Sequence, residues 1–430
     1  MKNFKIAVIG QGYVGFPLAI EFSFHFSVIG YDVNTKRIDE LMSGNDSKLE
    51  VESEKIKKSL ALYEQSQGQV GYLPSSDVST LKQANIYIIT VPTPIDRSNS
   101  PDLRYLKQAT ELVAGVLKSN DIVIYESTVY PGCTEEECVP LLEKYSNLEY
   151  NVDFFVGYSP ERINPGDKNN TLVNVVKVTS GSTVEIAAEI DQLYRTIIQA
   201  GTHLAPSIKV AEAAKAIENA QRDVNISFVN ELALMFDRMN IDTHEVLEAA
   251  GTKYNFLKYK PGLVGGHCIS VDPYYLTYKA EQLGYVPQVI LSGRRVNNMI
   301  ASFISNKLIK KLVLKGNVIT GSRILILGVT FKENCVDFRN SKVIDIIRDL
   351  QEFGLKVDLY DPWVDPQSFF HEHQLELINE LPRSGGYDGV ILAVAHDQFK
   401  NIQPRSLIKE NGVIFDVKAF WDKEAVDARL

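Results

Sequence analysis

The sequence predicts an α/β protein with two doubly wound parallel sheets joined by a long central helix. Short apolar runs that end in polar or glycine-rich turns alternate with helical segments, which is typical of βαβ units. Residues 323–335 repeat, in looser form, the strand-and-turn pattern of residues 5–19. Between the two halves, residues 211–239 carry apolar side chains at helical spacing and contain neither Pro nor Gly. We therefore expect each half to be a Rossmann-like doubly wound domain.

Length and composition limit the class of protein. A chain of 430 residues exceeds one ordinary core and predicts two or three domains. Hydrophobic content of 45% and charged content of 23% are typical of a soluble globular protein. The net charge of −9 argues against bulk nucleic-acid binding. The spacing of the four cysteines matches neither a zinc-binding template nor a small secreted disulfide framework, so we expect a cytoplasmic protein without a metal site. The first apolar run is interpreted as a strand, not a signal peptide, and no run is long enough to cross a membrane.

The first strand runs into a glycine-rich turn that predicts a dinucleotide site. KIAVIGQGYVGFPLA, at residues 5–19, places Gly10, Gly12 and Gly15 in G-x-G-x-x-G as a helix opens. The next apolar run ends in Asp32, close to the expected position about 20 residues further on. An acid there accepts hydrogen bonds from ribose hydroxyls and repels a 2′-phosphate, so we expect NAD rather than NADP. The alternative is a structural glycine turn in another α/β fold.

The remaining apolar runs complete the two sheets. In the first half they lie at residues 84–96, 121–132 and 154–167, and the polar region from Asp32 to about Gln69 is predicted to be helical. In the second half they lie at residues 323–335, 356–363, 387–396 and 412–418. The second half has Gly328 in its first turn but no G-x-G-x-x-G, and Lys332 follows. This predicts a nucleotide-type pocket that uses side-chain charge.

Cys268 is the candidate nucleophile. It lies in PGLVGGHCISVDPYYL, where glycines let the backbone approach a ligand and Asp272 follows four residues later. A buried structural cysteine is the alternative. Lys215 and Asn219 share one face of the predicted long helix and could stabilise an oxyanion. The alternative for Lys215 is a solvated lysine beside Glu212 and Glu218.

Other polar residues follow predicted strands, where ligands bind in such sheets. Glu161 could act as a base or orient water; the alternative is that Glu161 and Arg162 lie in a surface turn. Thr128 is a candidate ligand for water or amide, or merely a strand residue. Lys332 and Arg339 could bind phosphate or be solvated charges.

These segments together resemble the UDP-glucose/GDP-mannose dehydrogenase family over essentially the whole chain. The resemblance rests on KIAVIGQGYVG, VPTP, ESTVYPG, SPERINPG, AEAAKAIENAQRDVNISFVNE, GLVGGHCISVDPYYL and LGVTFKENCVDFRNS, in that order. It implies an NAD-binding domain at residues 1–205, a central helical dimerisation domain with the cysteine loop at 206–312, and a UDP-sugar-binding domain at 313–430. It also implies a homodimer.

The resemblance implies a role for each candidate residue. The implied catalytic residues are Cys268, Lys215, Asn219, Asp272, Glu161 and Thr128. The expected cofactor-binding residues are Gly10, Gly12, Tyr13, Val14, Gly15, Asp32, Arg37, Thr93, Thr128 and Arg339. The expected substrate-binding residues are Glu161, Arg162, Lys215, Asn219, Gly265, His267 and Lys332. The implied reaction is a four-electron oxidation of a primary alcohol to a carboxylate, through a thiohemiacetal and a thioester on the cysteine.

The residues around Cys268 suggest the substrate branch. The UDP-glucose branch typically has a small residue before the cysteine and a lysine before the acid, whereas this chain has His267 and Val271. GGHCISVDP and SPERINPGD resemble enzymes that oxidise UDP-GlcNAc or UDP-GalNAc for capsule, O-antigen or Vi-type polysaccharides. UDP-N-acetylmannosamine and UDP-glucose remain alternatives. Two other classes are a non-catalytic NAD sensor and a two-electron hydroxyacid dehydrogenase. The set of Cys268, Lys215, Asn219 and Asp272 disfavours the sensor, and the Cys268 loop with the second nucleotide-type domain argues against the hydroxyacid dehydrogenase.

Overall fold

The computed structural model describes residues 4–48, 50–96, 98–163, 170–266, 269–382 and 385–430. Two predicted site residues, His267 and Cys268, lie outside this part of the chain. The chain divides into two compact units: unit 1 comprises residues 1–218 and 274–284, and unit 2 comprises residues 219–273 and 285–430. Each unit is described by itself. The boundaries of the three predicted domains stay a prediction.

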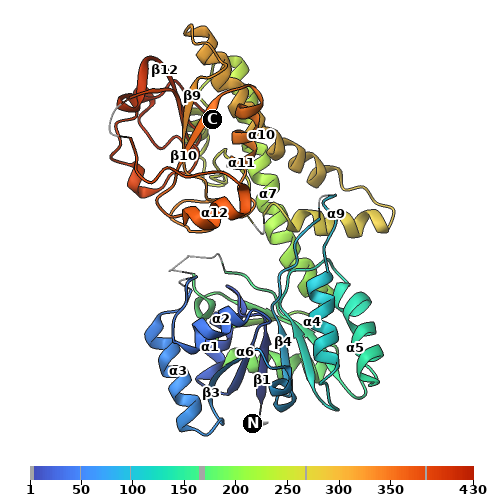
Figure 1. Cartoon of the computed structure of the whole chain (residues 1–430). Coiled ribbons are helices and arrows are strands. Elements are labelled where there is room, and N and C mark those ends of the chain that lie inside the picture. The colour runs from blue at the N-terminus through green and yellow to red at the C-terminus, as the bar shows by residue number, and fades with distance from the viewer. Residues whose placement is uncertain (1–3, 49, 97, 164–169, 267–268, 383–384) are drawn as a thin grey trace. The chain divides into compact units, whose positions relative to one another are not determined.

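Unit 1 contains a six-stranded parallel sheet in the order β3-β2-β1-β4-β5-β6 (Figure 1). The order reverses at β1, which pairs with β2 on one side and β4 on the other, as in a doubly wound dinucleotide-binding sheet. The strands are β1 (Lys5–Ile9), β2 (Ser27–Tyr31), β3 (Gly71–Ser75), β4 (Ile86–Ile89), β5 (Ile122–Tyr125) and β6 (Phe155–Tyr158). A separate parallel pair is formed by β7 (Lys177–Thr179) and β8 (Thr202–Leu204).

The helices of unit 1 alternate with these strands along the chain. They are α1 (Gly15–Ser23), α2 (Thr35–Met42), α3 (Ser53–Gln65), α4 (Arg104–Ala114), α5 (Val139–Ser146) and α6 (Val184–Arg195). The core between helices and sheet is apolar; Ile6, Val8 and Phe16 are fully buried in it. Helices α2 and α3 confirm the helical character predicted between Asp32 and Gln69, with a break at residues 43–52.

Strand β3 was absent from the sequence-based prediction. It contains Gly71 and Pro74, which normally disfavour a strand interior. The strand lies at the edge of the sheet, so a proline without an N–H group interrupts no second ladder of hydrogen bonds there.

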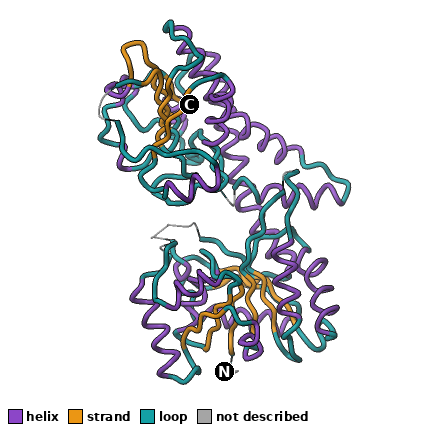
Figure 2. The backbone as a smooth tube through the Cα atoms, viewed as in Figure 1, coloured by secondary structure: helices purple, strands orange, loops and turns teal. Residues whose placement is uncertain are grey.

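Unit 2 contains a parallel sheet in the order β10-β9-β11-β12-β13. The strands are β9 (Arg323–Leu327), β10 (Lys356–Tyr360), β11 (Tyr387–Leu392), β12 (Ile408–Asp416) and β13 (Ala428–Arg429). Its helices include α8 (Thr243–Ala250), α10 (Gln288–Leu314), α11 (Val343–Glu352) and α12 (Pro366–His373). Figure 2 shows that this unit, like unit 1, contains both strands and helices. Along the chain, α11 separates β9 from β10, and α12 separates β10 from β11. The predicted pair of doubly wound sheets is therefore confirmed.

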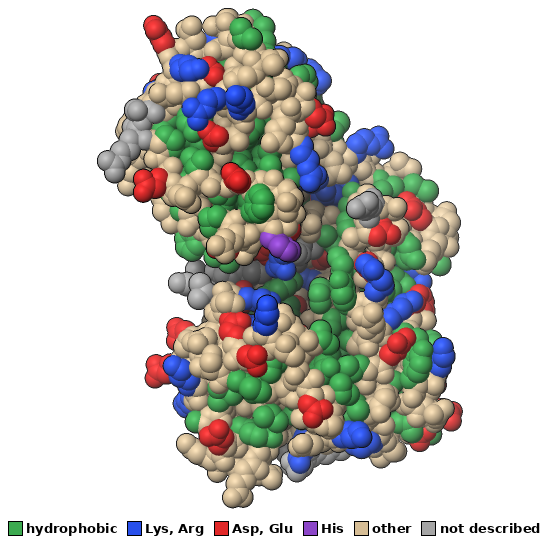
Figure 3. All heavy atoms as spheres, in the orientation of Figure 1, with side chains coloured by type: hydrophobic (Ala, Val, Ile, Leu, Met, Phe, Trp, Pro, Cys, Tyr) green, Lys and Arg blue, Asp and Glu red, His purple; other side chains and the backbone are tan. Residues whose placement is uncertain are grey.

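The predicted central helix is α7 (Ile208–Met239), which begins in unit 1 and ends in unit 2. Helix α9 (Asp272–Gln282) also spans both units. Within the described ranges, no helix combines the length and apolar character that crossing a bilayer requires. On the face drawn in Figure 3, basic and acidic side chains are interspersed, so neither sign of charge dominates that face.

A buried polar network joins α7 to α10 inside unit 2. Arg294 Nη1 donates to Asp223 Oδ1 at 2.5 Å, and both side chains are almost fully buried. Asn297 Nδ2 donates to the same carboxylate oxygen at 2.7 Å and accepts from Asn230 at 2.8 Å. Asn230 also hydrogen bonds both backbone groups of Gly262, at 2.8 and 3.0 Å. The network thus fixes the start of the glycine-rich loop that leads toward Cys268.

We predict that Asp223→Ala lowers the free energy of unfolding by about 3–5 kcal/mol, because it leaves the Arg294 guanidinium buried without its carboxylate. The double variant Asp223→Ala/Arg294→Met should recover part of this loss, since it removes the orphaned charge as well. Urea unfolding of the full chain measures both values. Equal stability of the single variant and wild type would contradict a stabilising role for the pair.

Candidate active site

Each of the three glycines in the first turn is explained by a different structural requirement. Gly10 has a φ of +98°, a conformation that L side chains rarely adopt. A Cβ on Gly15 would lie 2.0 Å from the Gly10 carbonyl oxygen and 2.2 Å from Thr90 Oγ1, so the helix could not pack so closely on the sheet. A Cβ on Gly12 would meet no atom within 4 Å.

The open space at Gly12 is compatible with a bound dinucleotide. Packing inside the protein explains Gly10 and Gly15, whereas at Gly12 the backbone is left accessible to a group outside the protein. That is the position at which a pyrophosphate contacts such a turn. Tyr13 and Val14 follow and lead into α1, whose N-terminus favours negative charge.

Asp32 lies directly after β2 and faces the turn. Its Oδ2 accepts from the Gln11 backbone N–H at 2.8 Å, and its Oδ1 accepts from Asn34 N–H at 2.9 Å. Arg37 is buried behind the turn: its Nε donates to the Gln11 carbonyl at 3.0 Å, and its Nη2 lies 2.8 Å from Asp46 Oδ1. Arg37 therefore braces the turn, and its direct contact with the cofactor stays a prediction.

Two loops at the carboxyl end of the sheet are joined by a hydrogen bond. Thr93, after β4, donates through Oγ1 to the Thr128 carbonyl, after β5, at 2.7 Å. The hydroxyl of Tyr275, on α9, donates to the Thr93 carbonyl at 2.8 Å, and the Tyr275 side chain is fully buried. The structure thus brings together two predicted site residues and adds Tyr275, a residue that the sequence motifs did not single out.

A buried charged cluster lies at the ends of β5 and β6. Lys177 Nζ is 2.7 Å from Glu126 Oε2 and 3.9 Å from Glu161 Oε2, and Tyr194 donates to the other oxygen of Glu126. Burial raises the pKa of Glu126, although Lys177 opposes this.

Glu161 is held within this cluster by its own backbone. Its Oε1 accepts from the N–H groups of Arg162 and Ile163 at 2.6 and 2.7 Å, while its Oε2 has no hydrogen-bond partner among the described residues. Glu161 is 7% exposed, so the surface-turn alternative is wrong. Arg162 pairs with Glu218 of α7 at 2.8 Å.

Lys215 is buried on α7, so the alternative of a solvated lysine is wrong as well. Glu212, three residues earlier, is fully buried and accepts from the N–H groups of Gly132 and Thr134 at 2.5 and 2.9 Å. These donors begin the helical segment that leads into α5, where backbone N–H groups lack helical partners. Burial raises the pKa of Glu212 to about 7.

In unit 2, Asn219 and Asp272 form a direct pair. Asn219 Nδ2 donates to Asp272 Oδ2 at 2.5 Å, and Asp272 is 2% exposed. The glycine-rich loop before Cys268 is tightly packed: a Cβ on Gly265 would lie 2.5 Å from the Asn340 carbonyl oxygen. Downstream of the cysteine, Ser270 Oγ donates back to the Gly266 carbonyl at 2.5 Å.

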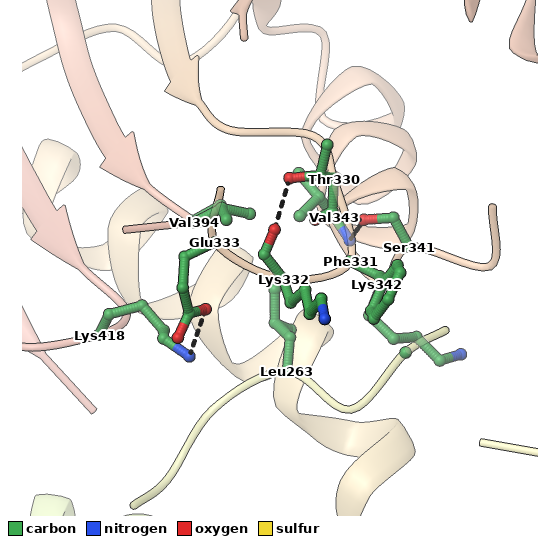
Figure 4. A pocket seen from close by; sticks show the side chains of 12 residues that line it. Leu263, Thr330, Phe331, Lys332, Glu333, Ser341, Lys342, Val343, Val394 and Lys418 are labelled. Carbon is green, nitrogen blue, oxygen red and sulfur yellow. Dashed lines mark hydrogen bonds and ion pairs between the residues drawn. The ribbon is translucent and has the colours of Figure 1, made fainter. Parts of the chain in front are cut away.

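The first turn of the unit 2 sheet borders a pocket with three lysines, Lys332, Lys342 and Lys418 (Figure 4). Leu263 and Gly265 line it from the glycine-rich loop, and Thr330 lines it from the turn after β9. Lys418 lies 3.8 Å from Glu333. This arrangement agrees with the predicted nucleotide-type pocket that uses side-chain charge.

The turns of the two sheets share a backbone pattern. Gly10 N–H donates to the Tyr31 carbonyl at 2.8 Å, and Gly328 N–H donates to Tyr360 at 2.9 Å. Asp361 Oδ2 accepts from Val329 N–H at 2.8 Å, as Asp32 accepts from Gln11. Asp361, however, is buried beneath His396 and Thr330. It is not open to a ribose in the way that Asp32 is.

The remaining predicted residues are placed as follows. Arg339 lies in unit 2, where its guanidinium forms two hydrogen bonds with Asp337 at 2.9 and 2.7 Å, and its role toward the cofactor stays a prediction.

No group of three or more His, Cys, Asp or Glu side chains in the described ranges could hold a metal ion. Sequence reasoning missed Glu126, Lys177 and His396, and considered Glu212 only as a helix neighbour of a solvated Lys215. The signal for Lys177 was a lysine inside an apolar strand.

Comparison with known proteins gives matches along the whole chain. Profiles of the UDP-glucose/GDP-mannose dehydrogenase family match at residues 4–198 (NAD binding domain), 209–299 (central domain) and 325–423 (UDP binding domain). A UDP-N-acetyl-D-glucosamine 6-dehydrogenase of Pseudomonas aeruginosa is 52% identical over 433 residues, covering 100% of both chains.

Two further proteins extend the comparison. An enzyme of the same name from Salmonella typhi is 52% identical over 430 residues, covering 99% of this chain and 98% of the other. The solved structure of a UDP-D-ManNAc dehydrogenase from Pyrococcus horikoshii superposes with a TM-score of 0.88 at 29% identity, covering 99% of this chain and 98% of the other.

We predict opposite effects for two glycine substitutions in the first turn. Gly12→Ala should leave the melting temperature nearly unchanged, because its Cβ enters open space, but should weaken NAD binding at least tenfold in a calorimetric titration. Gly15→Ala should cost about 2 kcal/mol or more of stability, because its Cβ collides with the Gly10 backbone. Unchanged NAD affinity in Gly12→Ala would contradict the placement of the cofactor.

We also predict a specific pH dependence from Glu212. The folded chain keeps this proton up to about pH 7, above the ordinary carboxyl pKa of 4.5, so stability from the protonated group is present below pH 4.5 and lost as pH rises through 7. The melting temperature of Glu212→Gln should therefore fall less than that of wild type between pH 5 and 8. Glu218→Gln, on the same helix, is the control and should follow wild type. Parallel curves for Glu212→Gln and wild type would contradict the raised pKa.

Proposed function

Because the chain belongs to the UDP-glucose/GDP-mannose dehydrogenase family and is an NAD-dependent oxidoreductase, we propose that it oxidises C6 of a UDP-N-acetylhexosamine to the uronic acid. The observation that carries this proposal is the 52% identity to the Pseudomonas aeruginosa UDP-N-acetyl-D-glucosamine 6-dehydrogenase over the full length of both chains. UDP-GlcNAc or UDP-GalNAc is the proposed substrate. The product would serve as a sugar donor for a capsule, O-antigen or Vi-type polysaccharide.

The NAD-binding turn is assigned to residues on unit 1. The backbone around Gly12 would hold the pyrophosphate, and Asp32 would accept from the ribose hydroxyls. NAD supplies a hydride acceptor. Thr93 and Thr128, tied together by their hydrogen bond, form the loops that we propose to border the reacting end of the cofactor.

The proposed chemistry on the sugar belongs to Cys268. Its sulfur adds to the aldehyde carbon that the first oxidation produces, and the resulting thiohemiacetal keeps the aldehyde bound. The second oxidation converts it to a thioester, which water cleaves to release the carboxylate and the thiol. Asp272, together with Thr128, is proposed to orient that water.

Lys215 and Asn219 are proposed to stabilise the oxyanions along this route. The Lys215 ammonium is buried, where it interacts more strongly with a developing negative charge than it would in water. Asn219 has two amide hydrogens, so one can hold Asp272 while the other faces substrate. Glu161 keeps Oε2 without a hydrogen-bond partner among the described residues, which supports its role toward water or substrate.

A homodimer is part of the proposal. Ile217, Phe228 and Met235 lie on one face of α7 and are 55%, 57% and 43% exposed, which is high for apolar side chains on a long helix. A second copy of the chain would cover this face.

One specific observation favours a second substrate. The superposition on the Pyrococcus horikoshii UDP-D-ManNAc dehydrogenase, with a TM-score of 0.88, keeps UDP-N-acetylmannosamine as the runner-up. Its identity of 29% is well below the 52% of the first proposal, which we therefore prefer.

Steady-state assays of NADH formation with UDP-GlcNAc, UDP-GalNAc, UDP-ManNAc and UDP-glucose test the proposal. We expect kcat/KM for UDP-GlcNAc or UDP-GalNAc to exceed that for UDP-glucose at least tenfold, because a pocket that hydrogen bonds an acetamide leaves polar groups unpaired with a hydroxyl sugar. Two NADH should form per sugar, and NADP should be a poor substitute. Preference for UDP-glucose or UDP-ManNAc would overturn the substrate, and one NADH per sugar would overturn the thioester route.

A further inference from the structure

We propose that His396 is a positioning residue for the nucleotide pocket of unit 2: it holds the loop from Thr330 to Asn334, and so places Lys332. The proposal rests on the proposed function, in which this pocket binds the UDP part of the substrate. His396 follows β11 and is fully buried. It touches the loop at both ends, through different ring nitrogens.

The two ring nitrogens have different partners, which determine the position of the ring proton. Asn334 donates its backbone N–H to Nδ1 at 2.9 Å, so Nδ1 acts as the acceptor. Nε2 lies 3.1 Å from Asp361 Oδ2 and 3.2 Å from Thr330 Oγ1. The Thr330 hydroxyl donates to the Lys332 carbonyl at 2.9 Å, so its oxygen is left to accept from Nε2–H. These contacts assign the proton to Nε2.

One carboxylate oxygen of Asp361 binds both His396 and the start of the loop. Oδ2 of Asp361 accepts from the N–H groups of Val329 and Thr330 at 2.8 and 3.2 Å, as well as from His396. Oδ1 accepts from the Trp363 N–H at 2.9 Å. The carboxylate, directly after β10, is thereby anchored independently of the histidine, so the ring is held in one orientation.

The far end of the loop is held beside His396 as well. Asn334 Nδ2 donates to Asp397 Oδ2 at 2.8 Å, and Asp397 N–H donates to Asn334 Oδ1 at 3.0 Å. Asn334 adopts a φ of +55°, the conformation in which the loop turns back. Its backbone N–H is then aimed at Nδ1 of His396.

The loop between these two anchors carries the pocket. Thr330, Phe331, Lys332 and Glu333 all line it, and they belong to no helix or strand. Figure 4 shows the Thr330 hydroxyl bonded to the Lys332 backbone, with the Lys332 side chain extending into the group of lining residues. One backbone hydrogen bond, from Phe331 N–H to the Asp337 carbonyl at 3.2 Å, supports this loop, and the side-chain contacts described above supply the rest. His396 therefore acts on a nucleotide through Lys332, without itself lining the pocket.

Two substitutions separate the contacts of the two nitrogens. His396→Asn places Oδ1 where Nδ1 lies, so it can still accept from Asn334 N–H, but it cannot reach Asp361. His396→Gln reaches toward Asp361 and loses the acceptor at Nδ1. Asp361 also holds the start of the loop directly, through the N–H groups of Val329 and Thr330, whereas the acceptor for Asn334 N–H comes from His396. Calorimetric titration with UDP alone should therefore show a Kd within about threefold of wild type for His396→Asn, and at least tenfold weaker binding for His396→Gln.

NAD affinity and melting temperature are the controls for folding, because the NAD turn lies in unit 1. Both variants should bind NAD as wild type does. Wild-type UDP affinity in His396→Gln would overturn the proposal, and so would equal weakening in the two variants. Failure of the wild-type chain to bind UDP would overturn the assignment of the pocket in the proposed function, which is a different result from either of these.

A double-mutant cycle tests the link between His396 and Lys332. It does not use His396→Asn, so it remains informative if that variant folds poorly. Lys332→Ala should weaken UDP binding about tenfold in the wild-type chain and less than twofold in the His396→Gln chain, because the lysine is already misplaced there. A general loss of stability would leave the two effects additive. Additive effects would therefore contradict the positioning role.

Discussion

In both sheets, backbone N–H groups in the first strand-to-helix turn need hydrogen-bond acceptors. This turn follows β1 in unit 1 and β9 in unit 2, and a carboxylate directly after the neighbouring strand, β2 or β10, accepts from it. Asp32 accepts from Gln11 in unit 1, and Asp361 accepts from Val329 and Thr330 in unit 2. Each turn starts with a glycine at positive φ, Gly10 or Gly328, whose N–H bonds the second strand. The shape of each ligand site depends on this turn, because a strand-to-helix turn exposes donors that no ladder or helix satisfies.

The two turns diverge in what covers the carboxylate. Asp32 is part-exposed and has no histidine above it in the described contacts, so its oxygens can meet a ribose. Asp361 is covered by His396, and hydrogen bonds from His396 and the backbone bring its pKa below the usual range although burial alone would raise it. The same backbone device thus supports a dinucleotide turn in unit 1 and a lysine-lined pocket in unit 2.

Buried charges from neighbouring elements hold the other site loops. Lys177 pairs with Glu126 beside Glu161, Glu212 accepts from the loop after Thr128, and Arg294 pairs with Asp223 behind Gly262. Such pairs contribute little net stability compared with an apolar core, but removing one partner is costly. Their effect is to give each loop one arrangement, which a catalytic site needs because its groups act only within short distances of the reacting atoms.

The sequence by itself determined the two doubly wound sheets, the long helix α7 and the glycine turn around Gly12, because apolar periodicity and glycine spacing are local properties of the chain. It left β3 undetected, since Pro74 is tolerated only at an edge that pairing with β2 defines. It also left open whether Lys215 and Glu161 are solvated or buried.

Only the tertiary structure decided those points, and only it revealed the supporting contacts of Lys177, Glu212 and His396. Lys177 meets Glu126 across 51 residues and His396 meets Asn334 across 62, so no local pattern joins them. A charged or polar side chain has the same local sequence signal whether it faces water or a buried partner. The partner that stabilises it is supplied by a strand or helix far away in the sequence, and its position is fixed only when the sheets pack.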